Sequence, residues 1–409
     1  MTNELANVPE LRFTGFEDKW EETNLGNIAN IVGGGTPKTE IPEYWNGEIN
    51  WYSPVEIGDR NYVYESKNKI TQLGLKKSSA KILPIGTVLF TARAGIGNTA
   101  ILKKEGATNQ GFQSIIPKEG VLDTYFIFSR TNELKRYGEI HGAGSTFVEI
   151  SGKEMAKMPI SIPVIKEQQK IGDFFSKLDR QIELEEQKLA KLEEQKKGYM
   201  QKIFSQELRF KDENGNDYPE WETKKLDELG EFNSGVGFPE KYQGGNIGVP
   251  FFKVSDMNLQ GNEKFMNTAN NYVSIEQVKQ RKWKVIQNVP AIIFAKVGAA
   301  IMLNRKRMIL NPFLIDNNTM SYSFSNHWDK NFGYAVFQML NLPKYAQVGA
   351  LPSYNSKDIG IIQIRLPIKE EQEKIGDFFS ELDKIINKQS QKIDALKLRK
   401  KGFLQKMFV

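Results

Sequence analysis

The chain contains a long internal repeat. Residues 167–179 read EQQKIGDFFSKLD and residues 371–383 read EQEKIGDFFSELD, so 11 of 13 positions match at an offset of 204. The same offset aligns residues 198–204 with residues 402–408. Because the chain has 409 residues, the repeat indicates a duplication in the order A, b, A′, b′.

The two kinds of segment have diverged to different extents. The b segments keep nearly the same sequence, whereas A and A′ share mainly a skeleton of hydrophobic positions and turns, such as Trp20 and Trp221. This contrast indicates that the b segments do one job twice, while A and A′ do the same kind of job on two different targets. The boundaries that we expect are residues 1–162, 163–206, 207–366 and 367–409 for A, b, A′ and b′.

Each b segment has the pattern of a coiled-coil helix. Apolar residues recur at alternating steps of four and three, and no proline interrupts the helix after Pro163 or Pro367. Because A′ lies between the helices in the chain, antiparallel pairing is more economical than parallel pairing, which would need A′ to span the whole rod. The expected seam consists of Ile171, Phe175, Leu178, Ile182, Leu189, Leu192, Ile375, Phe379, Leu382, Ile386, Ile393 and Leu396.

Two features of the helices allow two interpretations each. The polar seam residues Glu185, Lys196, Gln389 and Lys400 either reach solvent or fix the orientation and register of the pair. The first phenylalanine of each Phe-Phe pair, Phe174 or Phe378, lies one place off the seam and either packs on the flanking globular domain or offers a docking face to another subunit.

The A segments read as mixed α/β domains. Strands are expected at residues 87–92, 98–103, 113–117 and 291–296, and helices at residues 124–137 and 327–340. The fold class is therefore α+β: two divergent mixed α/β domains, separated by two long helices that form an antiparallel coiled coil with pseudo-twofold symmetry.

Composition and motifs argue against catalysis by this chain. It has no cysteine and two histidines, which excludes thiol chemistry and a histidine-based metal cage. The glycines of residues 95–100 fit the loose dinucleotide pattern, but the following segment is too short to be the binding helix and the second copy lacks the pattern. Neither a signal peptide nor a membrane-spanning run is recognisable, so we expect a cytoplasmic protein.

The layout resembles the specificity subunit of type I restriction–modification systems, across essentially the whole chain. Local features that are similar to the family include residues 34–37 (GGTP), residues 83–89 (LPIGTVL), and the Pro-then-Glu-Gln entries before each helix. The second domain departs from the pattern at residues 234–239 (SGVGFP), which puts in doubt a shared role for Thr36 and Lys38 in both halves.

The resemblance implies that each A segment is a target recognition domain, which reads one half of an asymmetric double-stranded DNA site, and that the helices act as a ruler. It implies no catalytic, metal or cofactor site in this chain. Two modification subunits with S-adenosylmethionine would dock on the helices, and restriction subunits with ATP and magnesium would join them. The docking residues would be Gln168, Phe174, Gln372 and Phe378.

Within this frame, basic side chains that recur in both domains are expected to hold phosphates, while Arg, Asn and Gln near the turns read base edges. The expected DNA-binding residues of the first domain are Thr36, Lys38, Lys76, Lys77, Lys81, Arg93, Asn98, Gln110 and Gln113. Those of the second domain are Lys279, Arg281, Lys282, Lys284, Lys296, Arg305, Lys306, Arg307 and Asn317.

Two other hypotheses are open to test. The chain could be a coiled-coil scaffold whose globular domains bind protein or glycan ligands, or a nucleotide-dependent enzyme. DNA binding through several phosphates weakens steeply with added salt, unlike binding at a dry protein interface. A nucleotide-dependent enzyme would bind an adenine nucleotide tightly.

Overall fold

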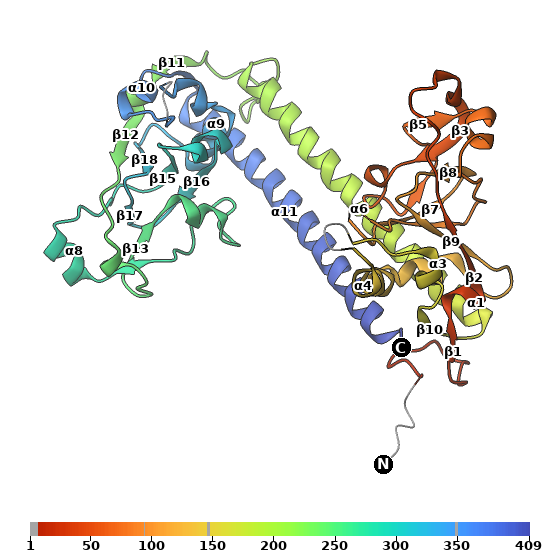
Figure 1. The fold of residues 1–409 in the computed structure, drawn as a ribbon. Helices are drawn as coiled ribbons and strands as arrows, with labels where there is room; N and C mark the ends of the chain where they lie inside the picture. Colours follow the sequence, from red (N-terminus) through yellow and green to blue (C-terminus); the bar gives the residue numbers. More distant parts are fainter. Residues whose placement is uncertain (1–6, 94, 145–147, 348–350) are drawn as a thin grey trace. The chain divides into compact units, whose positions relative to one another are not determined.

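A computed structural model of the chain describes residues 7–93, 95–144, 148–347 and 351–409. The chain forms two compact units: unit 1 comprises residues 1–187 and 391–409, and unit 2 comprises residues 188–390. The two long helices, α6 (Ile165–Phe204) and α11 (Lys369–Lys406), each contribute to both units (Figure 1). Each unit thus contains one globular domain and parts of both long helices.

The globular domain of unit 1 is built on three small sheets. The strands are β1 (Glu21–Asn24), β2 (Ala29–Gly33), β3 (Trp45–Tyr52), β4 (Tyr62–Val63), β5 (Asn68–Ile70), β6 (Val88–Phe90), β7 (Thr99–Leu102), β8 (Gly106–Thr108), β9 (Gln113–Pro117) and β10 (Pro159–Ile162). The helices are α1 (Leu25–Ile28), α2 (Gln72–Lys76), α3 (Thr124–Ser129), α4 (Thr131–His141) and α5 (Gly152–Met155).

The largest sheet of unit 1 has the order β2-β9-β6-β7-β4 and is antiparallel except at β7 and β4. The other sheets have the orders β5-β3-β8 and β1-β10. β6 and β7 are buried over their whole length, so neither shows the alternation of polar and apolar residues that a strand with one solvent-facing side would have. The main core cluster joins the β6 residue Phe90, the α3 residue Phe126 and the α6 residue Phe175.

Unit 2 repeats this plan. Its strands are β11 (Glu222–Lys225), β12 (Gly230–Ser234), β13 (Val249–Phe252), β14 (Tyr272–Val273), β15 (Ala291–Ala295), β16 (Lys306–Ile309), β17 (Leu314–Ile315), β18 (Thr319–Phe324) and β19 (Gln363–Leu366). Its shorter helices are α7 (Leu226–Leu229), α8 (Ile275–Arg281), α9 (Lys330–Met339) and α10 (Ser356–Gly360). The sheets have the orders β12-β18-β15-β16, β14-β13-β17 and β11-β19.

The mixed α/β prediction is confirmed, with one difference in a helix. The helix expected at residues 124–137 is divided at Arg130, whose backbone ends α3 and precedes α4. Arg130 is buried, and its guanidinium donates to Ser161 O at 2.5 Å and pairs with Glu133. The residue at the break is therefore a buried cation that is compensated by a carboxylate one turn along α4 and by a carbonyl of β10.

The long helices pair in antiparallel orientation within each unit. In unit 1, Phe174 contacts Phe403 and Asp179 contacts Lys400. In unit 2, Lys196 contacts Asp383 and Tyr199 contacts Phe378. Within each unit, the residue number of the partner on α11 therefore falls as the residue number on α6 rises. All twelve predicted seam residues are buried or half-buried, as the heptad pattern predicts. No helix among the described residues is long and apolar enough to cross a membrane.

Candidate nucleic-acid interface

Arg93 lies in the turn that connects β6 to β7. The hydroxyl of Thr91 donates to Gly95 O at 2.7 Å and accepts from Asn98 N at 2.9 Å, so one side chain closes the turn. Gly95 has a φ of 106°, a conformation that residues with a Cβ rarely adopt. The turn leads directly into a strand and not into a helix, which argues against a dinucleotide-binding role for its glycines.

A group of loop residues in unit 1, which we call the first-domain cluster, brings three of the predicted DNA-binding residues together. Thr36 and Gln110 are hydrogen-bonded through their side chains. A Cβ placed on Gly111 would stand 3.0 Å from Asn109 Oδ1 and 3.7 Å from Arg93 Nε. The cluster therefore consists of Thr36, Arg93, Asn109, Gln110 and Gly111.

The first-domain cluster presents hydrogen-bonding groups to solvent. The Gln110 side chain is exposed, and the Arg93 side chain keeps 35% of its surface accessible while its Nη1 lies 3.6 Å from Glu149 Oε2. At this distance and exposure the ion pair orients the guanidinium without holding it strongly. An exposed amide beside a guanidinium is the kind of donor set that pairs with the edges of adenine and guanine.

A glycine makes the close approach of two loops possible in each domain. A Cβ on Gly34 would stand 2.4 Å from Thr108 O, and a Cβ on Gly235 would stand 1.7 Å from Asp316 O. Either contact is far inside van der Waals distance, so only glycine fits. Gly235 is therefore the counterpart of Gly34, and the residue at the place of Thr36 in the second domain is Gly237.

Backbone hydrogen bonds identify further counterparts of the first-domain cluster in unit 2. Asn109 N donates to Tyr52 O at 3.0 Å, and Asp316 N donates to Phe252 O at the same distance. Gln110 therefore corresponds to Asn317, which is also exposed. Both members of this pair were predicted to read bases, and both carry a side-chain amide at the same place in the fold.

Arg93 and Lys296 are not counterparts, although each follows a buried strand. Ala92 N donates to Gly111 O, and Lys296 N donates to Asn318 O. This pattern equates Lys296 with Ala92 and places Val297 where the first domain has Arg93. A one-residue shift along an extended segment sends the side chain to the other side, so the two basic residues serve different surfaces.

Lys306 was predicted to bind DNA, and the structure shows that this prediction is wrong. Lys306 is 1% exposed, and its Nζ donates to Leu340 O at 2.5 Å, just beyond the last turn of α9. Burial lowers the pKa of Lys306 to about 8. An ammonium that is fully covered and bound to a helix-end carbonyl cannot contact phosphates, but it complements the negative end of α9.

The residues on either side of Lys306 in the chain are more accessible. Arg305 is half-buried and bonds through Nη1 to the side chain of Asn258. Arg307 is also half-buried, its Nε is buried without a partner, and burial lowers its pKa. Arg305 thus remains a candidate for DNA contact, whereas Arg307 is less suited to contact DNA.

The other predicted basic residues lie on exposed surfaces of short helices. Lys76, Lys77 and Lys81 lie in or just after α2, and the four basic residues of residues 279–284 lie in or just after α8. Trp283, between them, is buried at 8% exposure and packs under Arg281, whose guanidinium carbon lies 5.8 Å from its ring centroid. Both groups can therefore offer cations to a polyanion while the aromatic residue belongs to the core.

Three predicted residues lie apart from the contacts that define the first-domain cluster. Lys38 is exposed and accepts a bond from Trp45 Nε1 through its carbonyl. Asn98 is exposed beside Gly58. Gln113 is half-buried in β9, where its amide oxygen would lie 2.8 Å from a Cβ on Gly152. Gln113 therefore fills space inside the domain, which weakens its assignment as a base reader.

The predicted docking role of Gln168 and Gln372 is wrong. Both are 1% exposed, and each side chain is already bonded. Gln168 accepts from Asp123 N and donates to Pro163 O, and Gln372 accepts from Asp329 N and donates to Pro367 O. These glutamines attach the long helices to the globular domains and have no free face for another subunit.

Phe174 and Phe378 follow the packing interpretation. The ring of Phe13 lies 6.0 Å from that of Phe174, and the ring of Phe210 lies 5.6 Å from that of Phe378. Phe13 and Phe210 are the last residues of the repeated Glu-Leu-Arg-Phe sequence. This short repeat therefore covers the first phenylalanine of each Phe-Phe pair, a role that its spacing along the chain did not indicate.

Asn109 and Glu149 were not among the predicted residues. Asn109 Oδ1 accepts from Gly111 N at 2.8 Å and so shapes the loop that carries Gln110. The Asn-Gln-Gly sequence is typical of such a turn and could have indicated it. Glu149 had no comparable signal, because it meets Arg93 only through the tertiary fold.

The described residues contain no group of three or more His, Asp or Glu side chains that could hold a metal ion. Two related domains on paired helices, each with exposed hydrogen-bond donors at one set of loops, define a two-domain recognition protein. Comparison with known proteins then gives the family. Residues 17–194 and 218–398 both match the type I restriction modification DNA specificity domain, so the chain belongs to that family.

The chain is similar to specificity subunits over nearly its whole length. It is 30% identical to the type I restriction enzyme MjaIX specificity subunit of Methanocaldococcus jannaschii, across 93% of this chain and 90% of that protein. It is 32% identical to the EcoR124I/EcoR124II specificity subunit of Escherichia coli, across 41% of this chain and 43% of that protein.

Solved structures show the same fold. The S subunit of a type I restriction-modification system from M. genitalium superposes with a TM-score of 0.61 at 14% identity, covering 98% of this chain and 99% of the other. The protein is a specificity subunit of a type I restriction–modification complex, and it recognises DNA sequence through two domains. The scaffold and enzyme hypotheses are not favoured.

Proposed function

We propose that unit 1 and unit 2 each read one half of a bipartite, asymmetric DNA site. The observation that carries this proposal is the different chemistry at counterpart positions: Thr36, Arg93 and Gln110 in the first domain correspond to Gly237, Val297 and Asn317 in the second. The same loops with different side chains are suited to different bases.

Two joined domains supply specificity that one cannot. A domain that reads three or four base pairs meets a chance match roughly every 64–256 base pairs, which is too frequent for selective action on a genome. Two such domains that together read about seven base pairs meet one roughly every 16,000. In our proposal, Arg93, Gln110, Arg305 and Asn317 contact bases, while the exposed lysines of α2 and α8 contact phosphates.

The helix pair is proposed to set the spacer between the half-sites. Inserting one heptad within residues 182–196 of α6 and one within the matching residues 386–400 of α11 preserves the seam pattern of both helices while adding about 10 Å to the pair. We expect the modified sites to keep both half-site sequences and to change their spacing. An unchanged spacer would contradict the ruler.

The remaining chemistry is assigned to other subunits. We propose that two modification subunits carry S-adenosylmethionine and methylate the site, and that restriction subunits use ATP and magnesium. Because Gln168 and Gln372 are buried, docking would use other surfaces of the helices and the adjoining domains.

Sequencing the methylated positions of a host that expresses this chain with its modification subunit tests the central proposal. The expected result is a single bipartite motif with two unlike halves, which disappears when this chain is omitted. A salt titration of DNA binding by the same complex should show a steep fall in affinity. Continuous or palindromic motifs, or binding that ignores salt, would contradict the proposal.

A further inference from the structure

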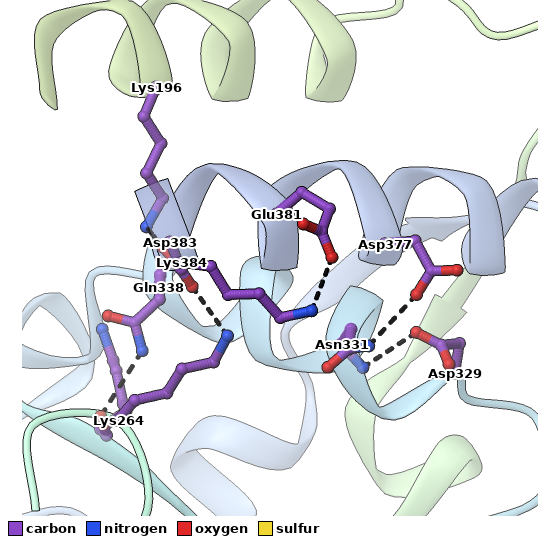
Figure 2. A network of polar contacts seen from close by, with 10 residues as sticks. Lys196, Lys264, Asp329, Asn331, Gln338, Asp377, Glu381, Asp383 and Lys384 are labelled. Atoms are coloured by element: carbon purple, nitrogen blue, oxygen red, sulfur yellow. Dashed lines mark hydrogen bonds and ion pairs between the residues drawn. The ribbon is translucent and has the colours of Figure 1, made fainter. Parts of the chain in front are cut away.

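The helix pair contains the same ion pair twice. In unit 1, Lys400 Nζ lies 2.6 Å from Asp179 Oδ1. In unit 2, Lys196 Nζ lies 2.5 Å from Asp383 Oδ1 (Figure 2). All four side chains are at least partly covered, with exposures between 7% and 28%. We call these two contacts the register pairs.

The repeat explains why the register pairs match. The offset of 204 residues relates Asp179 to Asp383 and Lys196 to Lys400. Each pair is therefore the other pair with the helices exchanged, as an antiparallel pseudo-twofold arrangement requires. The second oxygen of each carboxylate has its own partner: Asp179 accepts from Tyr125 Oη at 2.7 Å, and Asp383 from Lys264 Nζ at 2.8 Å.

The other ion pairs between the long helices do not recur. Glu186 pairs with Lys397 at 2.6 Å, but the positions related to them by the repeat are Ser390 and Glu193. Glu185 pairs with Lys392, but the repeat places Gln389 opposite Lys188. Among the ion pairs of the described helices, the register pairs alone join the two helices in the same way in both units.

The charges discriminate between helix orientations. In a parallel, in-register pair each seam residue would face its own repeat, so that the seam residue Lys196 would meet Lys400. Like charges would then be held together in partly covered positions, where repulsion is costly. Antiparallel pairing instead gives each of these lysines an aspartate partner. The apolar seam, which is nearly the same in both helices, offers no such preference.

We propose that the register pairs fix the antiparallel orientation and the register of the two long helices, and that they thereby set the distance between the half-sites that the protein recognises. The second part rests on the proposed function, whereas the first part does not. Polar residues at coiled-coil seams are known to specify register and orientation in this way.

The chain suits a direct test because it contains no cysteine. Glu185→Cys with Lys392→Cys reports the native register through a short thiol cross-linker. Glu185→Cys with Arg399→Cys reports a register that is shifted by one heptad. Each pair of cysteines is introduced into the full chain and into every charge variant below, so that the reporters are common to all comparisons.

Three charge variants of the full chain are compared. Lys400→Asp places two acids opposite each other, and adding Asp179→Lys restores attraction with exchanged signs. Tyr125 can accommodate the exchange because a hydroxyl accepts as well as donates. Lys397→Asp is the matched control, since it makes the same change one turn away at an exposed pair that does not recur.

We expect Lys400→Asp to lower the ratio of native to shifted cross-link about tenfold, the double variant to restore it, and Lys397→Asp to change it by less than about twofold. Methylation at sites with the native spacer should fall severalfold in Lys400→Asp and return in the double variant. If circular dichroism shows that Lys400→Asp has lost the helical signal of the pair, recovery of the helical signal and of the native cross-link in the double variant supports the proposal equally.

A native cross-link ratio in folded Lys400→Asp would overturn the register role, as would a double variant that restores neither helix nor ratio. The cross-links could follow the expected pattern while methylation shows no bipartite site in any variant. This outcome would support the register role of the pairs and refute the proposed function. A cross-link pattern as expected with an unchanged spacer and unchanged methylation would refute the link between register and half-site distance.

Discussion

Arg12 donates two parallel hydrogen bonds to the buried carboxylate of Glu167, from Nε to Oε1 at 2.7 Å and from Nη2 to Oε2 at 2.8 Å. Arg209 repeats this contact with Glu371 in unit 2. Both glutamates are fully buried at the first turns of the long helices. The bidentate geometry thus anchors the chain segment before each domain to the helix that follows the domain.

Replacing Arg12 by alanine should lower the free energy of unfolding of unit 1 by about 2–4 kcal/mol, because Glu167 would remain as a buried and uncompensated charge. Urea denaturation followed by circular dichroism measures this effect. Glu10→Gln is the control, since the Glu10–Lys406 pair is exposed and should contribute little. Equal and small effects of both substitutions would refute the anchoring role of Arg12.

Lys306 should make stability depend on pH. Its pKa is about 8 in the folded chain and 10.5 when unperturbed, so between these values the unfolded chain binds more protons. Stability contributed by this residue therefore rises as the pH rises through that window. Relative to Lys306→Met, the parent should gain about 2 kcal/mol between pH 7.5 and pH 10. Comparing the two proteins removes the contributions of other titrating groups.

The same variant tests the corrected role of Lys306. Lys306→Met should bind DNA with unchanged affinity and salt dependence, whereas replacing the exposed Lys77 by methionine should weaken binding to all sequences and reduce the salt slope by about one. Lys77→Met should also show no pH-dependent gain in stability. A loss of salt dependence in Lys306→Met would restore it to the DNA-binding surface.

Arg93→Ala should relax or weaken reading of one half-site only, by about 1–3 kcal/mol at the affected position. Methylation profiling of both half-sites measures the change. Val297, its counterpart, supplies the control: Val297→Ala removes no hydrogen-bond donor and should leave the identity of the second half-site intact. Equal loss at both halves, or unchanged modification by Arg93→Ala, would refute the assignment.

Two helix glycines should respond in opposite directions to alanine. A Cβ on Gly376 would stand 2.7 Å from Phe332 N and 2.4 Å from Asp329 Oδ1, so Gly376→Ala should destabilise unit 2 by about 1–3 kcal/mol. Gly402 has no neighbour within 4 Å, so Gly402→Ala should stabilise its helix by up to about 1 kcal/mol. Thermal melting distinguishes these outcomes, and destabilisation of similar size by both would contradict the close-approach explanation.

Much of the architecture could be predicted because its signals are local. The heptad spacing of residues such as Ile171, Phe175 and Leu178 requires only that one side of a helix be apolar, and all twelve seam residues are buried or half-buried. β6, β7 and β15 were likewise recognisable from their β-branched and aromatic residues between turn residues. The break at Arg130 has no comparable local signal, and the Ser161 carbonyl that its guanidinium contacts comes from β10.

The candidate interface was only partly predictable for the same reason. Gln110 and Asn317 were identified from their residue type near turns, and the fold places them at counterpart positions. Lys306 stands in a basic run beside Arg305 and Arg307, and nothing in the sequence separates a lysine that binds the carbonyl at the end of α9 from one that faces solvent. Gln168 and Gln372 were similarly misassigned, because their hydrogen-bond partners lie about 45 residues away in the chain.

The sequence by itself determined the duplication, the coiled-coil seam and the two-domain organisation, since repetition and periodicity are properties of the chain. Tertiary structure decided which charges remain free. A lysine or arginine can neutralise a buried carboxylate, complement a helix end or contact a phosphate, and only the positions of distant partners select among these roles. The register pairs combine both levels: the repeat duplicates Asp179 and Lys196, and antiparallel pairing brings each of them to the other's copy.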